Sequence, residues 1–197
     1  MPGVLIAIEG LDQSGKETQA QLLRDWLRSE GHKARVVTFP DYGTSIGEEI
    51  ARALQGEREY SPEVMQLLYV VNRYERKVDI ERWLEGGVTL VCDRYVASGV
   101  AYGEASNLEP VWLADAQKFL PSPTLTILLD ISAEISVQRK AADRDLYERD
   151  LVLQKRVRQS YLRQVEQSDW VRVDGEQSKA AIAREITDLV AARLALK

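Results

Sequence analysis

A segment near the start of the chain has the residue types and the spacing to bind a polyphosphate. Gly10, Gly15 and Lys16 match the pattern G-x-x-x-x-G-K, between an apolar run and a stretch with helical periodicity. Glycines let the backbone fold around a phosphate, amides at the start of the helix point at the anion, and the lysine adds positive charge. We therefore predict a phosphate-binding loop (P-loop) over residues 10–18. Its residues are Gly10, Leu11, Asp12, Gln13, Ser14, Gly15, Lys16, Glu17 and Thr18.

The residue after Lys16 departs from the usual P-loop pattern. Glu17 stands where most such loops have Ser or Thr, whose hydroxyl binds Mg²⁺. Thr18 is no simple substitute, because one further residue along a helix turns a side chain by about 100°. Either Glu17 binds the ion through its carboxylate or a water, or Glu17 is solvated and phosphates hold the ion with another acid. We favour the second alternative.

A second pair of chemically active residues follows an apolar run. Asp93 ends the run VTLVCD, and Arg94 comes directly after it. An acid at the C-terminal end of a strand beside the phosphate strand is well placed for Mg²⁺ or its water shell. An adjacent arginine can bind two phosphate oxygens at once. Taken alone, the two residues could also form a local ion pair.

A third candidate segment, residues 139–150, is rich in charge and follows the apolar run TLTILLD. It contains Arg139, Arg144 and Arg149. Such a run is more often a solvated helix face, but after a P-loop and the Asp93–Arg94 pair we interpret it as a mobile lid. Its arginines would then stabilise phosphate charge during the reaction.

Composition excludes several other functions. His32 is the only histidine and Cys92 the only cysteine, so mechanisms with a histidine base or a Cys/His zinc site are ruled out. Cys92 ends an apolar run and is expected to be a buried thiol. The net charge of −5 argues against a nucleic-acid coat. No apolar run approaches a bilayer span and the first residues do not resemble a signal peptide, so we expect a cytoplasmic protein without membrane contact.

The elements that position these residues follow from the apolar runs. Five runs have strand character and alternate with segments of helical periodicity. We therefore predict one α/β domain over residues 1–197, a three-layer α/β/α structure with a five-stranded parallel sheet. The expected strands are VLIAIEG, ARVVTF, VTLVCD, TLTILLD and WVRV. Helices are expected from the P-loop to residue 30, over 61–86, 110–119, 133–142 and 151–166, and from 178 to the C-terminus.

The segment DRYVASGVAY, residues 93–102, resembles the signature of thymidylate kinases, a family of P-loop nucleoside monophosphate kinases. Three further segments agree with that family in order and spacing, namely FPDYGTSIGEEI, LLYVVNRYERK and the lid RKAADRDLYERD. The resemblance covers nearly the whole chain. It implies transfer of the γ-phosphoryl group of ATP to dTMP with Mg²⁺, giving dTDP and ADP, by a homodimer formed through apolar helix faces such as that of residues 62–85.

The resemblance also implies roles for residues in three acceptor regions, about 39–43, 69–73 and 93–103. Tyr69 would stack under the thymine and Arg73 would bind its carbonyl edge, which their four-residue spacing on a helix allows. Asp12 would contact the sugar 3′-hydroxyl, and Tyr102 would occupy the place of a 2′-hydroxyl. Ser98 would approach the base, and the loop of Phe39, Pro40 and Tyr42 would lie over the acceptor phosphate. The implied catalytic residues are Lys16, Arg94, Arg139, Arg144 and Arg149.

Several residues depart from the family pattern. Tyr42 stands where many relatives have an arginine, which leaves part of the acceptor-phosphate clamp to Arg94 or to Arg94 together with Arg73. Gly99 and Gly103 stand where some relatives have Asn and Gln, so water could replace a direct contact to the thymine ring nitrogen. Gln13 replaces an arginine that some relatives have in the P-loop, so transition-state charge would be met from the lid.

Three alternative functions remain open from the sequence. A deoxynucleoside kinase would need a carboxylate base near the 5′-oxygen, and no acid is apparent before Asp93, whereas a phosphate monoester is already ionised and needs no base. A kinase for another nucleoside monophosphate is the second alternative. A nucleotide-binding regulator, in which Glu17 has removed Mg²⁺ chemistry, is the third, and Asp93, Arg94 and the lid arginines argue against it.

Overall fold

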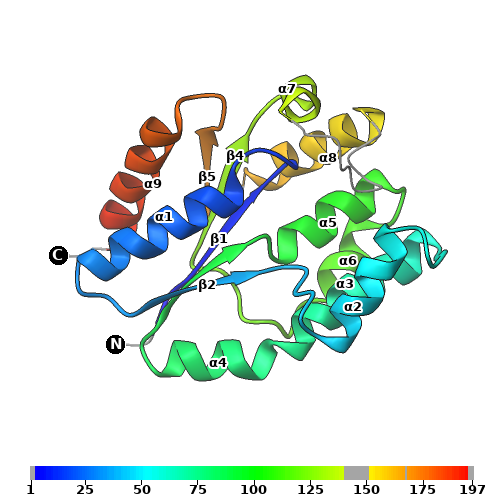
Figure 1. Ribbon diagram of the computed structural model, residues 1–197, viewed down its shortest axis with the longest axis horizontal. Helices are drawn as coiled ribbons and strands as arrows, with labels where there is room; N and C mark the ends of the chain where they lie inside the picture. Colours follow the sequence, from blue (N-terminus) through cyan, green and yellow to red (C-terminus); the bar gives the residue numbers. More distant parts are fainter. Residues whose placement is uncertain (1–2, 140–150, 167, 195–197) are drawn as a thin grey trace.

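A computed structural model describes residues 3–139, 151–166 and 168–194 of the chain. Its described residues form a parallel five-stranded sheet with the order β2-β3-β1-β4-β5 (Figure 1). The strands are β1 (Leu5–Gly10), β2 (Ala34–Thr38), β3 (Thr89–Asp93), β4 (Leu125–Asp130) and β5 (Trp170–Asp174). All five runs with strand character are therefore confirmed as strands.

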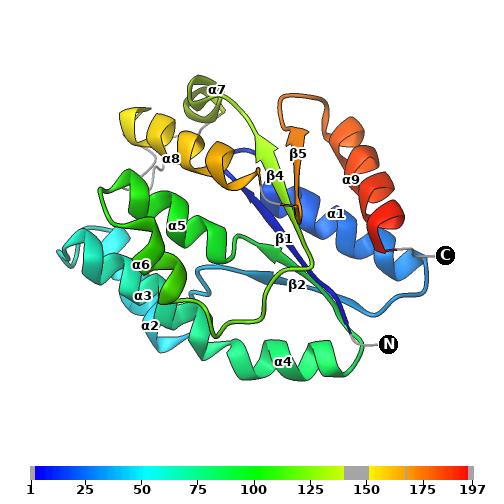
Figure 2. The ribbon, with the colours of Figure 1, turned by 180° about the vertical axis from the view of Figure 1, so that it is seen from behind.

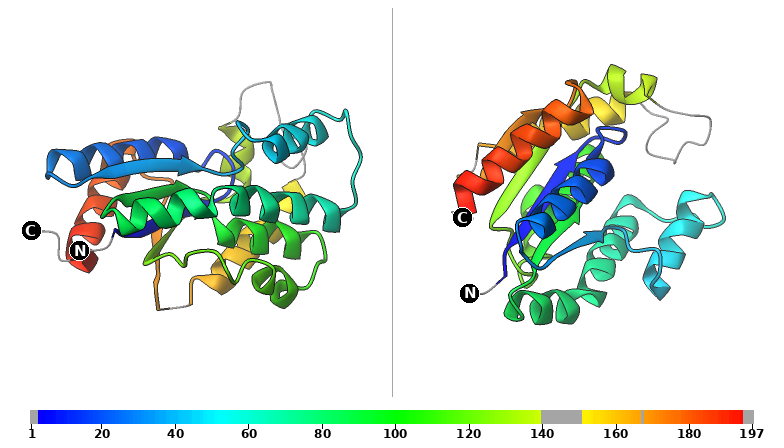
Figure 3. Two further views of the ribbon diagram at one scale, coloured as in Figure 1. Left: turned by 90° about the horizontal axis from the view of Figure 1, so that it is seen from below. Right: turned by 60° about the vertical axis from the view of Figure 1, so that its left-hand side comes forward.

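Helices cover both faces of the sheet, as Figures 2 and 3 show from other sides. One face is covered by α1 (Lys16–Ser29) and α9 (Lys179–Leu194). The other is covered by α4 (Lys77–Glu85), α5 (Val96–Ala105) and α8 (Leu151–Gln164). The predicted three-layer α/β/α class is confirmed.

The sheet is buried on both faces, which explains its almost continuous apolar runs. Every residue of β1 is buried, and successive side chains point to opposite layers. Ile6 and Ile8 pack with Leu23 of α1, whereas Leu5 packs with Ile80 of α4. Cys92 is buried and free, as predicted.

The remaining helices include α2 (Ser45–Leu54), α3 (Pro62–Glu75), α6 (Pro110–Asp115) and α7 (Ala133–Gln138). In Figure 1, α2, α3 and α6 lie together beyond one end of the sheet. Thr44, Ser61 and Ser132 cap the first turns of α2, α3 and α7 by accepting a backbone N–H. Among the described residues, no helix is long and apolar enough to cross a membrane.

The single helix predicted over residues 61–86 is wrong, because the structure divides it into α3 and α4 at Arg76. Arg76 is the C-cap of α3 and the N-cap of α4, and its N donates to Arg73 O, three residues back, as in the tighter turn of a helix end. The Arg76 side chain is also bound outside the helix, with Nε donating to Asp41 at 2.6 Å. The segment has neither Pro nor Gly at this point, so the sequence carried no local signal of the break.

Other helix expectations need smaller corrections. Helices α2 and α5 were not expected. The segment of α2 was interpreted as part of the loop over the acceptor phosphate. The helix expected over 110–119 ends at Asp115, and the one expected over 133–142 ends at Gln138. The part of the latter beyond residue 139 lies outside the described residues, as do Arg144 and Arg149 of the predicted lid.

Candidate functional site

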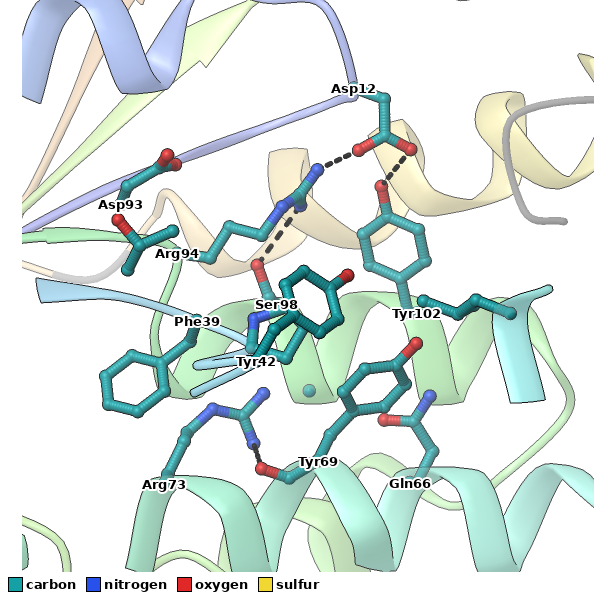
Figure 4. A pocket seen from close by; sticks show the side chains of 14 residues that line it. Asp12, Phe39, Tyr42, Gln66, Tyr69, Arg73, Asp93, Arg94, Ser98 and Tyr102 are labelled. Atoms are coloured by element: carbon teal, nitrogen blue, oxygen red, sulfur yellow. Dashed lines mark hydrogen bonds and ion pairs between the residues drawn. The ribbon is translucent and has the colours of Figure 1, made fainter. Parts of the chain in front are cut away.

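A pocket lies at the C-terminal ends of β1, β2 and β3, where α3 and α5 face each other (Figure 4). This end of a parallel sheet is the usual place for a ligand site in open α/β folds. Many of the predicted acceptor residues line it, together with Thr38, Leu54 and Gln66, which the sequence interpretation did not include. The lining residues are Asp12, Thr38, Phe39, Pro40, Tyr42, Leu54, Gln66, Tyr69, Arg73, Asp93, Arg94, Ser98, Gly99 and Tyr102.

The P-loop joins β1 to α1 and depends on glycine at its first position. Gly10 has φ of 144°, and a Cβ there would lie 2.5 Å from Leu129 O. Gly15 has φ of 93° and is the N-cap of α1, so the free amides of the first helical turn open onto the loop. The predicted strand–loop–helix context of the motif is therefore confirmed.

Lys16 is buried inside this loop. Its Nζ donates to Leu11 O at 2.6 Å and lies 3.3 Å from Ser14 Oγ. Burial, and then the nearby Arg94 charge, lower the pKa of Lys16 to about 8. The carboxylates of Asp12, Asp93 and Glu9 act in the opposite direction and favour the ammonium form, as a bound polyphosphate would.

Asp12, Arg94 and Tyr102 form a polar cluster on one side of the pocket (Figure 4). The Arg94 guanidinium donates to Asp12 Oδ1 and lies 5.2 Å from the centre of the Tyr102 ring. Tyr102 OH donates to Asp12 Oδ2 at 3.1 Å. Arg94 has φ of 63°, an unusual backbone conformation for a residue with a side chain. The corner after β3 therefore turns Arg94 toward the P-loop.

The charges in this cluster are well defined. Burial alone would raise the pKa of Asp12, but Arg94 and Lys16 outweigh it and hold that pKa below its ordinary value. Burial would lower the pKa of Arg94, but Tyr102 and Asp12 raise it well above its ordinary value. Both groups are therefore charged at neutral pH, and the pocket presents a cation to an incoming anion.

Glu9 of β1 binds the backbone and side chains around this corner, and the sequence interpretation did not include it because it lies within an apolar strand. The Glu9 carboxylate is fully buried and accepts from Tyr95 N at 2.8 Å and from Ser98 Oγ at 2.6 Å. Tyr161 of α8 also donates to Glu9, at 3.1 Å. Ser98 lines the pocket, but its hydroxyl already forms hydrogen bonds with Glu9 and Tyr161.

The wall opposite the P-loop is one face of α3. Gln66, Tyr69 and Arg73 follow the i, i+3, i+7 spacing of a helix face, and all three line the pocket. Arg73 Nη1 donates to Gln117 Oε1 at 2.7 Å and to Tyr69 O at 3.1 Å. Burial lowers the pKa of Arg73 to about 10, a value at which the group remains cationic at neutral pH.

Gly99 and Gly103, the two departures on α5, differ in position. Gly99 lines the pocket, and a Cβ there would lie 3.0 Å from Gln117 Nε2 and 3.1 Å from Arg73 Nη2. A Cβ at Gly103 would instead lie 2.4 Å from a methyl carbon of Leu113. Gly103 is therefore required for packing between α5 and α6, and only Gly99 bears on the ligand pocket.

Residues 39–44 form a loop over the pocket that is fixed to α3. Asp41 N donates to Asn72 Oδ1 at 2.8 Å, and Asn72 Nδ2 donates to Thr44 Oγ1 at 2.8 Å. Phe39 is buried against the Tyr95 ring, with centroids 5.7 Å apart, and precedes a cis peptide bond to Pro40. The loop is thus held by α3, the same helix whose other residues form this wall of the pocket.

Three further predicted residues lie around the P-loop. Asp93 is 7% exposed and lines the pocket, and its negative charge acts to raise the pKa of Lys16. Glu17 is exposed on the first turn of α1. Arg139 is exposed at the end of α7, where its guanidinium donates to Gly175 O at 3.1 Å and to Gln13 O at 3.5 Å. Arg139 thus lies beside the P-loop.

The sequence and the fold both resemble known proteins. A family model described as thymidylate kinase matches residues 8–186. The chain is 35% identical to the thymidylate kinase of Schizosaccharomyces pombe over 95% of this chain and 91% of that protein. It is 33% identical to the human thymidylate kinase over 93% of this chain and 88% of that protein. The structure of the thymidylate kinase from Candida albicans matches with a TM-score of 0.90 and 28% identity, covering 100% of this chain and 94% of the other.

Proposed function

The chain belongs to the thymidylate kinase family and is a dTMP kinase; on this premise we propose that the pocket at the ends of β1, β2 and β3 is its dTMP site. One observation carries the proposal: residues from three different elements line the same pocket. They are Asp12 of the P-loop, the cation Arg94 after β3, and Tyr69 and Arg73 of α3. An anionic group near Arg94 and a planar base near Tyr69 are the two ends of a nucleoside monophosphate.

The contacts in the pocket support a role for each residue. Tyr69 would stack on the thymine, and Arg73, whose Nη1 is fixed by Gln117, would donate to a base carbonyl. Asp12 would accept from the 3′-hydroxyl, and Tyr102, which already contacts Asp12, would lie where ribose has its 2′-hydroxyl. Ser98 would act through the packing of α5, since Glu9 already binds its hydroxyl. Phe39, Pro40 and Tyr42 would lie over the acceptor phosphate.

The ATP phosphates would occupy the P-loop, residues 10–18. Lys16 is buried there, and burial, followed by the nearby Arg94 charge, lowers its pKa to about 8. A triphosphate would add negative charge beside this ammonium group. Amides from Gly15 onward open onto the same space. Arg139, which contacts Gln13 O from the end of α7, is close enough to the loop to assist. Arg144 and Arg149 stay predictions of the lid.

The residues beside the P-loop fit Mg²⁺ as a co-substrate ion. Among the described residues, no group of three or more acids, His or Cys could hold a metal. Asp93 is a carboxylate at the pocket edge, and oxygen from one acid together with phosphates suits the coordination of Mg²⁺. The ion would neutralise charge on the phosphates when bound. Glu17 is exposed on α1, which favours its interpretation as a solvated residue.

The reaction needs positioning and positive charge more than proton transfer. The acceptor phosphate is largely ionised at neutral pH, so no side chain must remove a proton. Arg94 would orient the attacking phosphate, and Lys16 would bind the β- and γ-phosphates from the other side. Because the two cations lie near one another at the P-loop, they would offset the repulsion between two anionic substrates.

We expect ADP release from ATP and Mg²⁺ to be fast with dTMP, slower with dUMP, and near background with UMP, AMP, GMP or thymidine. Each acceptor would be offered alone in a coupled assay. Turnover with thymidine would instead place the protein among nucleoside kinases. No turnover with any acceptor would support a nucleotide-binding regulator.

We also propose that the chain forms a homodimer through the outer face of α3. Val64, Leu67 and Val71 are 39%, 43% and 43% exposed and lie on one helical stripe, away from the pocket-lining face of the same helix. A contiguous apolar stripe in water favours burial in an interface. The single-domain organisation over 1–197 and a cytoplasmic location remain predictions.

Leu67→Asp should therefore convert the protein from twice the chain mass to 22.3 kDa in sedimentation experiments. The reason is that an unpaired carboxylate would be desolvated in the interface. Ala192→Asp is the control, because Ala192 is exposed on α9, away from α3. A wild-type chain that already sediments at 22.3 kDa would refute the dimer.

A further inference from the structure

Gln66 lines the pocket and carries a buried side-chain oxygen that accepts no hydrogen bond from the described residues. Its side chain is 1% exposed and lines the pocket, yet Oε1 has no hydrogen-bond partner in the described part of the chain. Leaving a buried amide without a partner costs free energy, so such groups in native proteins usually serve a bound ligand or water. The two ends of a glutamine amide are interchangeable by rotation, so this side chain can also present its Nε2–H to the pocket.

The position of Gln66 on α3 indicates which part of a nucleotide it faces. Gln66 lies about 4.5 Å along the helix axis from Tyr69 on one side, and Arg73 lies about 6 Å from Tyr69 on the other. Figure 4 shows Gln66 and Arg73 on opposite sides of Tyr69, with Tyr102 on the Gln66 side. The α3 face thus has two hydrogen-bonding groups that flank one aromatic ring.

We propose that Gln66 is a second base-recognition residue, whose Nε2 donates to the 2-carbonyl of the pyrimidine. The inference rests on the proposed dTMP site, in which Tyr69 stacks on the base, Arg73 binds the 4-carbonyl and Tyr102 lies at the sugar. The 2-carbonyl is next to the glycosidic bond and therefore on the sugar side of the ring, which is the side of Gln66. A thymine stacked on Tyr69 would then be held at both carbonyls.

The contact of Gln66 with the 2-carbonyl and that of Arg73 with the 4-carbonyl would select for different features of the base. Thymine, uracil and cytosine all carry a 2-carbonyl, so Gln66 would favour pyrimidines as a class. Only thymine and uracil carry a 4-carbonyl, so Arg73 would reject the 4-amino group of cytosine, because two donors would then meet. Removing the Gln66 amide should consequently weaken the binding of dTMP and of dUMP to the same extent. The ratio of their KM values should stay unchanged.

Gln66→Met tests the proposal, because Met has a similar length and no amide. The KM for dTMP should rise about tenfold while kcat and the KM for ATP change less than about twofold. The melting temperature should stay the same or rise, because a buried amide without a partner has been removed. A structural residue would behave differently, since its loss would lower the melting temperature and leave the KM for dTMP unchanged.

A substrate analogue locates the contact at one atom. Wild-type protein should prefer dTMP over its 2-thio analogue, whose sulfur is a weak acceptor, and Gln66→Met should show almost no preference. Gln19→Met is the matched control, because Gln19 is 2% exposed with an unpartnered Oε1 but lies on α1 outside the pocket. An undiminished preference in Gln66→Met would overturn the inference.

Arg73→Met separates failure of this inference from failure of the site itself. A higher KM for dTMP in Arg73→Met, with no change in Gln66→Met, would leave the proposed base site intact and reject only the role of Gln66. An unchanged KM in Arg73→Met would show that the base binds elsewhere, and both proposals would fall.

Discussion

Lys16→Met should lower kcat for dTMP phosphorylation by about 10³-fold, the scale expected for losing one preorganised charge at a transferring phosphoryl group. Lys16 is the buried cation of the P-loop and is 6% exposed. Within the described part of the chain, its Nζ donates to uncharged oxygens of Leu11 and Ser14 and to no carboxylate. Charge that develops on the γ-phosphate would meet this ammonium group directly. Single-turnover and steady-state assays at saturating dTMP would measure the loss.

Folding and acceptor binding provide the controls for Lys16→Met. The variant should unfold at the same or a higher temperature, because it removes a desolvated charge, and its affinity for dTMP should stay within about twofold. A kcat within tenfold of the wild type would contradict a role for Lys16 in the chemical step.

The pH dependence gives an independent readout of the same group. The folded protein lowers the pKa of Lys16 to about 8, mainly by burial, so the free enzyme loses this positive charge as pH rises above that value. The quantity kcat/KM for ATP reports the free enzyme and should therefore fall above about pH 8. Once bound, the triphosphate stabilises the ammonium form, so kcat should hold to higher pH. Lys16→Met should lack the alkaline decline.

The sheet could be predicted from the sequence because buried parallel strands need apolar side chains on both faces. The runs VLIAIEG and TLTILLD show this directly, and both became fully buried strands. Helix α5 was not predicted, because its Ala- and Gly-rich segment has no amphipathic pattern and it is buried on several sides. The break at Arg76 depends on contacts with Asp41, which lies in a distant segment and could not be inferred from local periodicity.

The candidate site was predictable where a motif fixes both residue type and spacing. Gly10, Lys16 and the Asp93–Arg94 pair belong to this class, and the structure brings them together at neighbouring strands. Glu9 was missed because a single polar residue among apolar neighbours has no spacing to recognise. Gln117 was missed because it lies in the mixed segment ADAQKFL, where no pattern marks one polar residue as buried. Gln66 did carry a signal, since it shares a helix face with Tyr69 and Arg73.

Deleting the Arg94 side chain should lower kcat/KM for dTMP by about 10³-fold, and two deletions distinguish the guanidinium from the backbone that carries it. Arg94 has φ of 63°, a conformation that Gly adopts freely and Ala does not. Arg94→Gly and Arg94→Ala should therefore lose activity equally, although Arg94→Gly should unfold at the higher temperature. Unequal activities would mean that the backbone corner, and not the guanidinium, limits the reaction.

Arg94→Lys then tests whether charge alone is sufficient. A lysine keeps the positive charge but loses the planar pair of donors and the contact with the Tyr102 ring. Because two phosphate oxygens must be oriented for in-line attack, we expect kcat/KM for dTMP in Arg94→Lys to be about tenfold higher than in Arg94→Ala and well below that of the wild type. Full recovery would show that Arg94 acts as a point charge that attracts the acceptor, whereas partial recovery would show that its fork geometry aligns the two phosphates.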